Sequence, residues 1–113
     1  SLVNEKFMEQ KMPIGNERSR ESWDDASQLR KKAGAWLREK RTELGISQRE
    51  LADRVKIDYY TFISQIEAGR GRVPAERFRD WAIALEMEPR ELAMNLMKYY
   101  DPHTFELIFP NDC

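Results

Sequence analysis

The sequence predicts an all-α fold of five short helices, and two observations indicate it. Apolar residues recur at helical spacing, as at Ala33, Trp36, Leu37 and Leu44, which is typical of a helix with one buried face. Glycine or proline interrupts these stripes, as Gly45 does, where helices commonly begin or end. We therefore expect short helices joined by turns around one modest core.

Each expected helix has a start or stop signal. Asp24 and Asp25 place acidic side chains at the start of the first helix, where the helix dipole favours them. Ser47 and Glu50 have the spacing of a capping box, which predicts the start of the second helix. Pro74 suits the first position of the fourth helix. The expected helices run from Trp23 to Leu44, Ser47 to Val55, Tyr59 to Ala68, Pro74 to Leu85 and Pro89 to Tyr100.

The pattern divides the chain into three segments. Residues 1–22 have no sustained period and are expected to form a flexible or marginally helical arm, and residues 23–100 form the helical domain. Residues 101–113 form a short tail, whose run Thr104–Phe109 is rich in residues that favour a β-strand. An unpaired apolar strand invites association, so the tail is a candidate dimerisation segment, although folding back onto the domain is an alternative.

The composition excludes several classes of protein. The chain has 113 residues, of which 41% are hydrophobic, and no run approaches the length of a membrane span. The first residues lack the apolar core of a signal peptide, and the one cysteine, Cys113, cannot form an internal disulfide. We therefore expect a cytoplasmic protein with no membrane partner.

The net charge of −1 hides an uneven distribution. Residues 23–73 hold eleven basic and eight acidic side chains, whereas residues 74–113 hold four basic and eight acidic ones. Affinity for phosphate depends on local charge, because counterions are released only where Lys and Arg meet the nucleic-acid backbone. The near-neutral total therefore does not exclude a nucleic-acid partner.

Two segments resemble one family of DNA-binding proteins. The runs Leu44–Ala52 and Thr61–Gly69 look like the paired helices of the XRE family, which includes the Cro and CI repressors of lambdoid phages. The resemblance extends from about Ala33 to Tyr100, and it implies a Cro/CI-like helix-turn-helix domain in a bacterial or phage-encoded protein. One departure is a turn about one residue longer than usual, with Lys56 at the place of a common turn glycine.

The third helix is expected to read double-stranded DNA. Its core side carries Ile63 and Ile66, so its other side faces outward. Gln65 has the geometry for a bidentate contact with adenine, and the matching position reads bases in the resembled repressors. The residues expected to reach bases are Tyr60, Thr61, Ser64 and Gln65.

A second group is expected to contact phosphates. The start of the second helix, with Ser47 and Gln48, resembles the end that docks on the DNA backbone, and Tyr59 is a further candidate unless it plugs the turn. Arg70 and Arg72 lie in the loop that follows the reading helix, where a solvated loop is the alternative.

The resemblance also implies a structural ion pair, between Arg41 of the first helix and Glu67 of the third. Such a pair would tie the reading helix to the rest of the domain, so neither residue is expected to bind DNA.

Catalysis, cofactor binding and metal binding find no support in the sequence. His103 and Cys113 are the one histidine and the one cysteine, too few for a tetrahedral metal site. Both lie in the tail, and no Cys/His or Ser/His/Asp set is evident. We expect a homodimeric transcription regulator that binds an inverted-repeat operator near a promoter. Bound there, it would block polymerase as a repressor or recruit it as an activator, and the sequence does not decide between the two. The alternative is an antitoxin whose C-terminal segment binds a partner protein such as a toxin or antirepressor.

Overall fold

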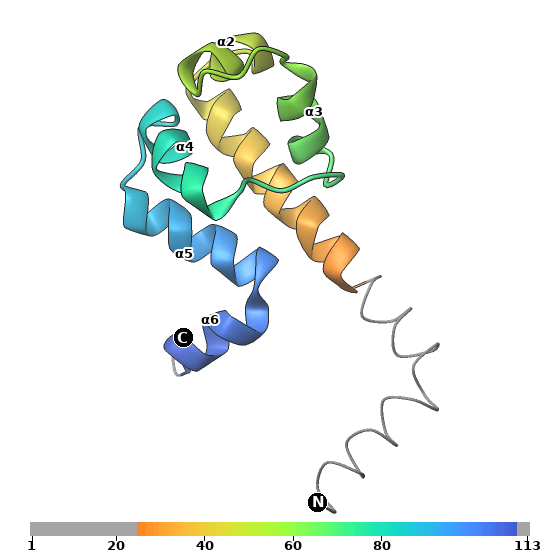
Figure 1. Cartoon of the computed structure of the whole chain (residues 1–113), viewed down its shortest axis with the longest axis vertical. Helices are drawn as coiled ribbons and strands as arrows, with labels where there is room; N and C mark the ends of the chain where they lie inside the picture. The colour runs from red at the N-terminus through yellow and green to blue at the C-terminus, as the bar shows by residue number, and fades with distance from the viewer. Residues whose placement is uncertain (1–24, 111–113) are drawn as a thin grey trace, which may run out of the picture.

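The computed structural model describes residues 25–110, and all regular structure in this part of the chain is helical (Figure 1). A long helix occupies residues 25–43. It is followed by α2 (Gln48–Arg54), α3 (Thr61–Glu67), the 3-10 turn η1 (Ala75–Arg77), α4 (Phe78–Ala84), α5 (Pro89–Tyr100) and α6 (Pro102–Ile108). The expected arm over residues 1–22 and the expected helix start at Trp23 and Asp24 lie outside the described residues.

The core lies where the 25–43 helix, α3, α4 and α5 meet. Figure 1 shows the long helix crossing the molecule, with α2 and α3 around its upper half and α4 stacked above α5 on the other side. The predicted core residues Ala33, Leu37, Ile63 and Ile66 are buried, whereas Trp36 and Leu44 are half-buried. The largest side chains with less than 2% exposure are Trp81, Leu37, Leu51, Ile63, Ile66, Leu92, Leu96, Val55 and Val73. Removing these apolar side chains from water is the main term that stabilises the fold.

Two glycines allow the 25–43 helix and the end of α3 to come unusually close. A Cβ atom added at Gly34 would lie 2.4 Å from the carbonyl oxygen of Glu67 and 2.5 Å from that of Ile66. Gly69 ends α3 with a φ of +83°, and a Cβ there would lie 2.7 Å from the Cα of Lys31. Backbone therefore packs directly on backbone at this contact, which sets the distance of α3 from the core.

Two expected helix boundaries are shifted by local bonding. The third helix begins at Thr61 and not at Tyr59, because the Phe62 N–H donates to the Tyr59 carbonyl in a tighter turn (3.1 Å) that precedes the regular helix. Pro74 has an extended backbone (φ −62°, ψ 145°) and therefore stands just before η1, which leads into α4.

The expectation of a β-like tail is wrong. Pro102 begins the helix α6, where its fixed φ suits the first turn and its missing N–H costs no hydrogen bond. Phe105 and Phe109 lie one turn apart with ring centroids 5.0 Å from each other, and α6 packs against α5. Strand propensity depends strongly on context, and here the contacts with α5 and between the two rings override it.

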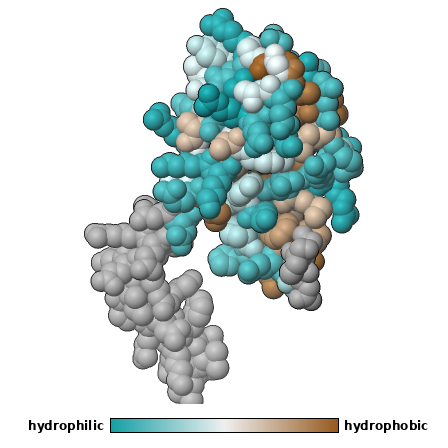
Figure 2. Space-filling view, turned by 180° about the vertical axis from the view of Figure 1, so that it is seen from behind, coloured by the Kyte–Doolittle hydropathy of each residue, from teal (hydrophilic) through white to brown (hydrophobic). Residues whose placement is uncertain are grey.

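The surface is largely hydrophilic, with apolar side chains in a few places. Figure 2 shows hydrophilic residues over most of the rear face, with apolar ones near its upper end and at its lower end, around α6. On that helix Leu107 is 83% exposed and Ile108 is 54% exposed. The C-terminal helix thus leaves apolar area in contact with solvent.

Gly34→Ala is expected to destabilise the domain by about 1–3 kcal/mol, because the added methyl group would overlap carbonyl oxygens that cannot move independently of α3. Urea unfolding of the two proteins measures the difference. Gly71→Ala is the matched control, since its Cβ would lie 3.8 Å from Ile66, an ordinary contact. Equal stability of the Gly34→Ala protein and the parent would contradict the close packing.

Candidate nucleic-acid interface

α2 and α3 form two short helices joined by a turn over residues 55–60. Ser47 caps α2 as the sequence predicts: its hydroxyl oxygen accepts from the Glu50 N–H at 3.0 Å, and the Ser47 N–H donates to the Glu50 carboxylate at 3.4 Å. Lys56, in the turn, has a φ of +59°, a left-handed conformation in which glycine is favoured. At Lys56 the turn therefore has a backbone conformation that suits the glycine expected there, although the side chain differs.

α3 separates a buried side from an exposed one. Ile63 and Ile66 are each 1% exposed and face the core. Thr61 and Gln65 are exposed, and Ser64 is half-buried. The helix thus has the predicted arrangement of a polar side directed away from the core.

Three aromatic residues lie at the start of α3. Tyr59 is 76% exposed, which does not fit a residue that plugs the turn, and Tyr60 is 39% exposed. Phe62 is 42% exposed. Phe62 is not among the residues predicted to reach bases, and its exposure could not be expected from helical spacing, because it lies four residues before the buried Ile66. The exposed side of α3 is therefore more aromatic than expected.

Arg41 and Glu67 form the ion pair that the resemblance implies. The Arg41 guanidinium donates to both carboxylate oxygens of Glu67, from Nε at 2.7 Å and from Nη2 at 3.0 Å, and its Nη1 donates to the Ile46 carbonyl at 2.8 Å. Both residues are 8% exposed. Because the guanidinium and the carboxylate form two hydrogen bonds in a bidentate arrangement, the pair holds the end of α3 against the 25–43 helix.

Gln48 belongs to the same cluster. Its Nε2 donates to Glu67 Oε1 at 3.0 Å, so the side chain bridges the start of α2 and the end of α3. A carboxamide nitrogen carries two hydrogens, and one of them remains for another acceptor. The sequence predicts that Gln48 contacts a phosphate, but it does not predict the bond to Glu67, because the two residues are 19 positions apart.

The two loop arginines have different surroundings. Arg70 is exposed. The Nη2 of Arg72 instead lies 3.2 Å from Asp101 Oδ2, and its guanidinium carbon is 4.5 Å from the centre of the Tyr100 ring. The Tyr100 hydroxyl accepts from the Val73 N–H at 3.1 Å, and burial raises the pKa of this phenol. Arg72 is therefore drawn toward the α5–α6 junction.

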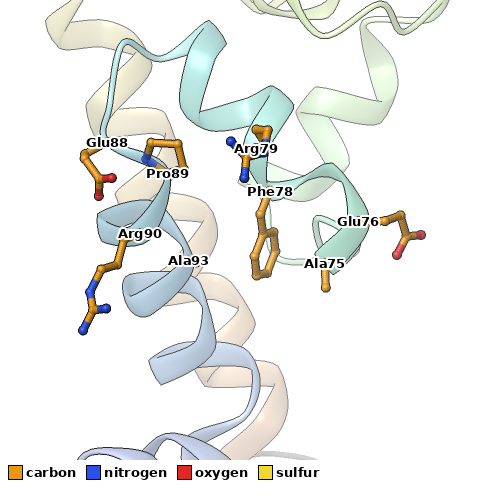
Figure 3. A pocket seen from close by; sticks show the side chains of 8 residues that line it. All are labelled: Ala75, Glu76, Phe78, Arg79, Glu88, Pro89, Arg90 and Ala93. Atoms are coloured by element: carbon orange, nitrogen blue, oxygen red, sulfur yellow. The ribbon is translucent and has the colours of Figure 1, made fainter.

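Three open depressions lie away from the exposed side of α3. Figure 3 shows one of them, an open depression between η1, α4 and α5, with Phe78 directed into the space and Arg90 and Glu88 pointing outward at the rim. Within residues 25–110 no group of three His, Cys, Asp or Glu side chains is close enough to hold a metal ion. None of the helices there is both long and apolar enough to cross a membrane.

Comparison with known proteins identifies the fold. A family model described as helix-turn-helix matches residues 37–92, which contain α2, α3 and α4. The crystal structure of the restriction-modification controller protein C.AhdI from Aeromonas hydrophila is similar at 38% identity and a TM-score of 0.53. The similarity covers 97% of that protein and 61% of this chain. The chain belongs to the XRE family of helix-turn-helix proteins.

Membership of the XRE family makes the chain a DNA-binding transcription regulator, as the paired motifs predict. No curated protein sequence matches the chain. The residues that the family model matches include α2 and α3, and so include the exposed polar side of α3.

Replacing Arg41 by Met should destabilise the domain by about 3–5 kcal/mol, because the buried Glu67 carboxylate would lose its bidentate partner. The double variant Arg41→Met, Glu67→Leu should recover part of that loss, since it removes both charges together. Urea unfolding of the parent, both single variants and the double variant measures the coupling. Strictly additive effects would show that the two side chains do not stabilise each other.

Proposed function

We propose that this protein is a sequence-specific regulator that binds an inverted-repeat operator as a dimer, with α3 of each subunit in the major groove. The observation that carries the proposal is the two-sided character of α3: Ile63, Ile66 and Glu67 anchor it, while Thr61 and Gln65 face solvent. An α-helix with its side chains is about 10–12 Å across, and the major groove of B-DNA is about 12 Å wide.

We assign base reading to the exposed side of α3 and to the residues just before it. Gln65 donates to and accepts from an adenine, while Thr61 and Ser64 are short enough to let the helix approach the base edges. Tyr60 and the exposed ring of Phe62 are placed beside them and suit contact with thymine methyl groups. The aromatic content of this side supports a site rich in A·T pairs.

Phosphate contacts fall to residues around α3. Gln48 keeps one amide hydrogen for a phosphate while it holds Glu67. Ser47, which caps α2, and the exposed Tyr59, in the turn before α3, are the further candidates. Arg70 is exposed in the loop that leaves α3. For Arg72, a phosphate must compete with Asp101, which makes its contribution to binding the smaller of the two.

Dimer formation is assigned to the C-terminal end of the molecule. Leu107 and Ile108 expose apolar area on α6, and covering it with a second copy would remove that area from water. Two subunits would then place their α3 helices in successive grooves, about one helical turn apart. A different protein on the same surface, as in an antitoxin, is the second candidate, and the exposed apolar side chains of α6 are the observation that favours it.

Selection of bound fragments from random duplex DNA by the full chain should recover inverted repeats whose half-site centres are about 10 base pairs apart. Gln65→Ala should bind the selected site about 1–3 kcal/mol more weakly and lose its preference at one position in each half-site. Failure to enrich any sequence would reject the proposed function. Enrichment of single half-sites would reject the dimer, and an unchanged preference would remove Gln65 from the reading set.

Arg70→Ala should weaken binding to all sequences and make the slope of log affinity against log salt less negative by about 0.9 for each subunit, or about 1.8 for the dimer, because each subunit loses one phosphate contact. Arg72→Ala should change the slope by less, since its guanidinium is paired with Asp101. In an Asp101→Asn background the effect of Arg72→Ala should rise toward that of Arg70→Ala. Fluorescence anisotropy over a range of salt concentrations measures all the slopes. Equal slopes for the Arg70→Ala and Arg72→Ala proteins in the parent background would show that Asp101 does not compete with a phosphate for Arg72.

A further inference from the structure

Arg49 stacks on Tyr60 where the helix pair meets. Arg49 lies in the first turn of α2 and is exposed, and Tyr60 directly precedes α3. The guanidinium carbon lies 4.5 Å from the centre of the Tyr60 ring. The contact therefore joins the two helices on the solvent side, next to the residues proposed to enter the groove.

The guanidinium has no carboxylate partner among the ion pairs of residues 25–110. Its acidic neighbour Glu50 accepts from the Ser47 N–H, and Asp53, one turn further along α2, takes part in none of these pairs. A stacked guanidinium uses its face for the ring, while its N–H groups project from the edge. Arg49 thus presents a full positive charge and unused donors.

Stacking also orders the side chain in advance. A free arginine loses considerable rotamer entropy when it binds a ligand, whereas one already held against a ring loses less. The planar fork matches the geometry of a phosphate, to which it can donate two parallel hydrogen bonds. Arg49 is thus a prepositioned hydrogen-bond donor for a phosphate.

We propose that Arg49 is a DNA-backbone contact, and that Tyr60 is the positioning residue that holds its guanidinium toward a phosphate beside α3. The proposal rests on the proposed entry of α3 into the major groove. Arg49 comes from α2, which flanks α3, and the part of the duplex that flanks a helix in the groove is the sugar-phosphate backbone. The contact adds affinity without reading sequence.

The first test compares Arg49→Ala, Arg49→Lys and the parent on the fragment recovered by selection and on a mixed-sequence duplex. Arg49→Ala should weaken binding to both by about tenfold or more and make the salt slope less negative by about 0.9 for each subunit, since both subunits of the dimer lose the contact. Arg49→Lys should keep most of the slope, because it keeps the charge, but bind more weakly than the parent because it lacks the fork. The matched control is Arg90→Ala at the start of α5, which lies across the molecule from α3 and should bind like the parent (Figures 1 and 3).

The second test isolates the role of Tyr60. Tyr60→Phe keeps the ring and should leave the cost of Arg49→Ala unchanged, whatever it does to base preference. Tyr60→Leu removes the ring, and in that background Arg49→Ala should cost clearly less than tenfold. A purely structural role of Tyr60 would leave the Arg49 effect the same in both backgrounds, and that result would overturn the positioning role.

The outcomes separate this inference from the proposed function. If the parent binds its selected fragment and Arg49→Ala changes neither affinity nor salt slope, the backbone contact is wrong and the proposed function stands. If Arg49→Ala weakens only the selected fragment, Arg49 reads a base and the inference is equally overturned. If the parent binds neither duplex, both proposals fail. Thermal unfolding of each variant shows whether it retains the fold of the parent.

Discussion

The bidentate pair between Arg41 and Glu67 is the constraint on which the position of α3 depends. The pair lies at the end of α3, where Gly34 also lets the backbone of the 25–43 helix contact that of α3. Gln48 adds the start of α2 to the same carboxylate. One buried acidic group thus fixes three helices, and the exposed side of α3 can carry polar and aromatic residues because none of them is needed to hold the helix in place.

Much of the fold could be predicted from the sequence, because it depends on local signals. The capping box at Ser47 and Glu50, and Pro89 at the start of α5, act within one turn of helix and are present as expected. The apolar stripes gave the inner faces correctly, Ile63 and Ile66 included, since helical periodicity alone decides which side of α3 is buried. The ion pair required the family resemblance, because nothing in the local sequence links positions 41 and 67.

The features that were missed depend on contacts between distant residues. Strand propensity in Thr104–Phe109 predicted the wrong structure, because α6 is stabilised by packing on α5 and by the tilted contact between the rings of Phe105 and Phe109. The close approach at Gly34 has no local signature, since a glycine within a helical stripe indicates by itself only a lower helix propensity. The partner of Arg72 lies 29 positions away, beyond any pattern that a short window can detect.

The junction between the last two helices has a geometric consequence. Asp101 is both the residue that ends α5 and the residue that precedes α6, so no linker separates the two helices. Each residue of an α-helix turns the chain by about 100°. Extending α5 by a single residue would therefore swing Leu107 and Ile108 to another side of the molecule, and the direction in which this end of the protein can associate is encoded in the exact length of one helix.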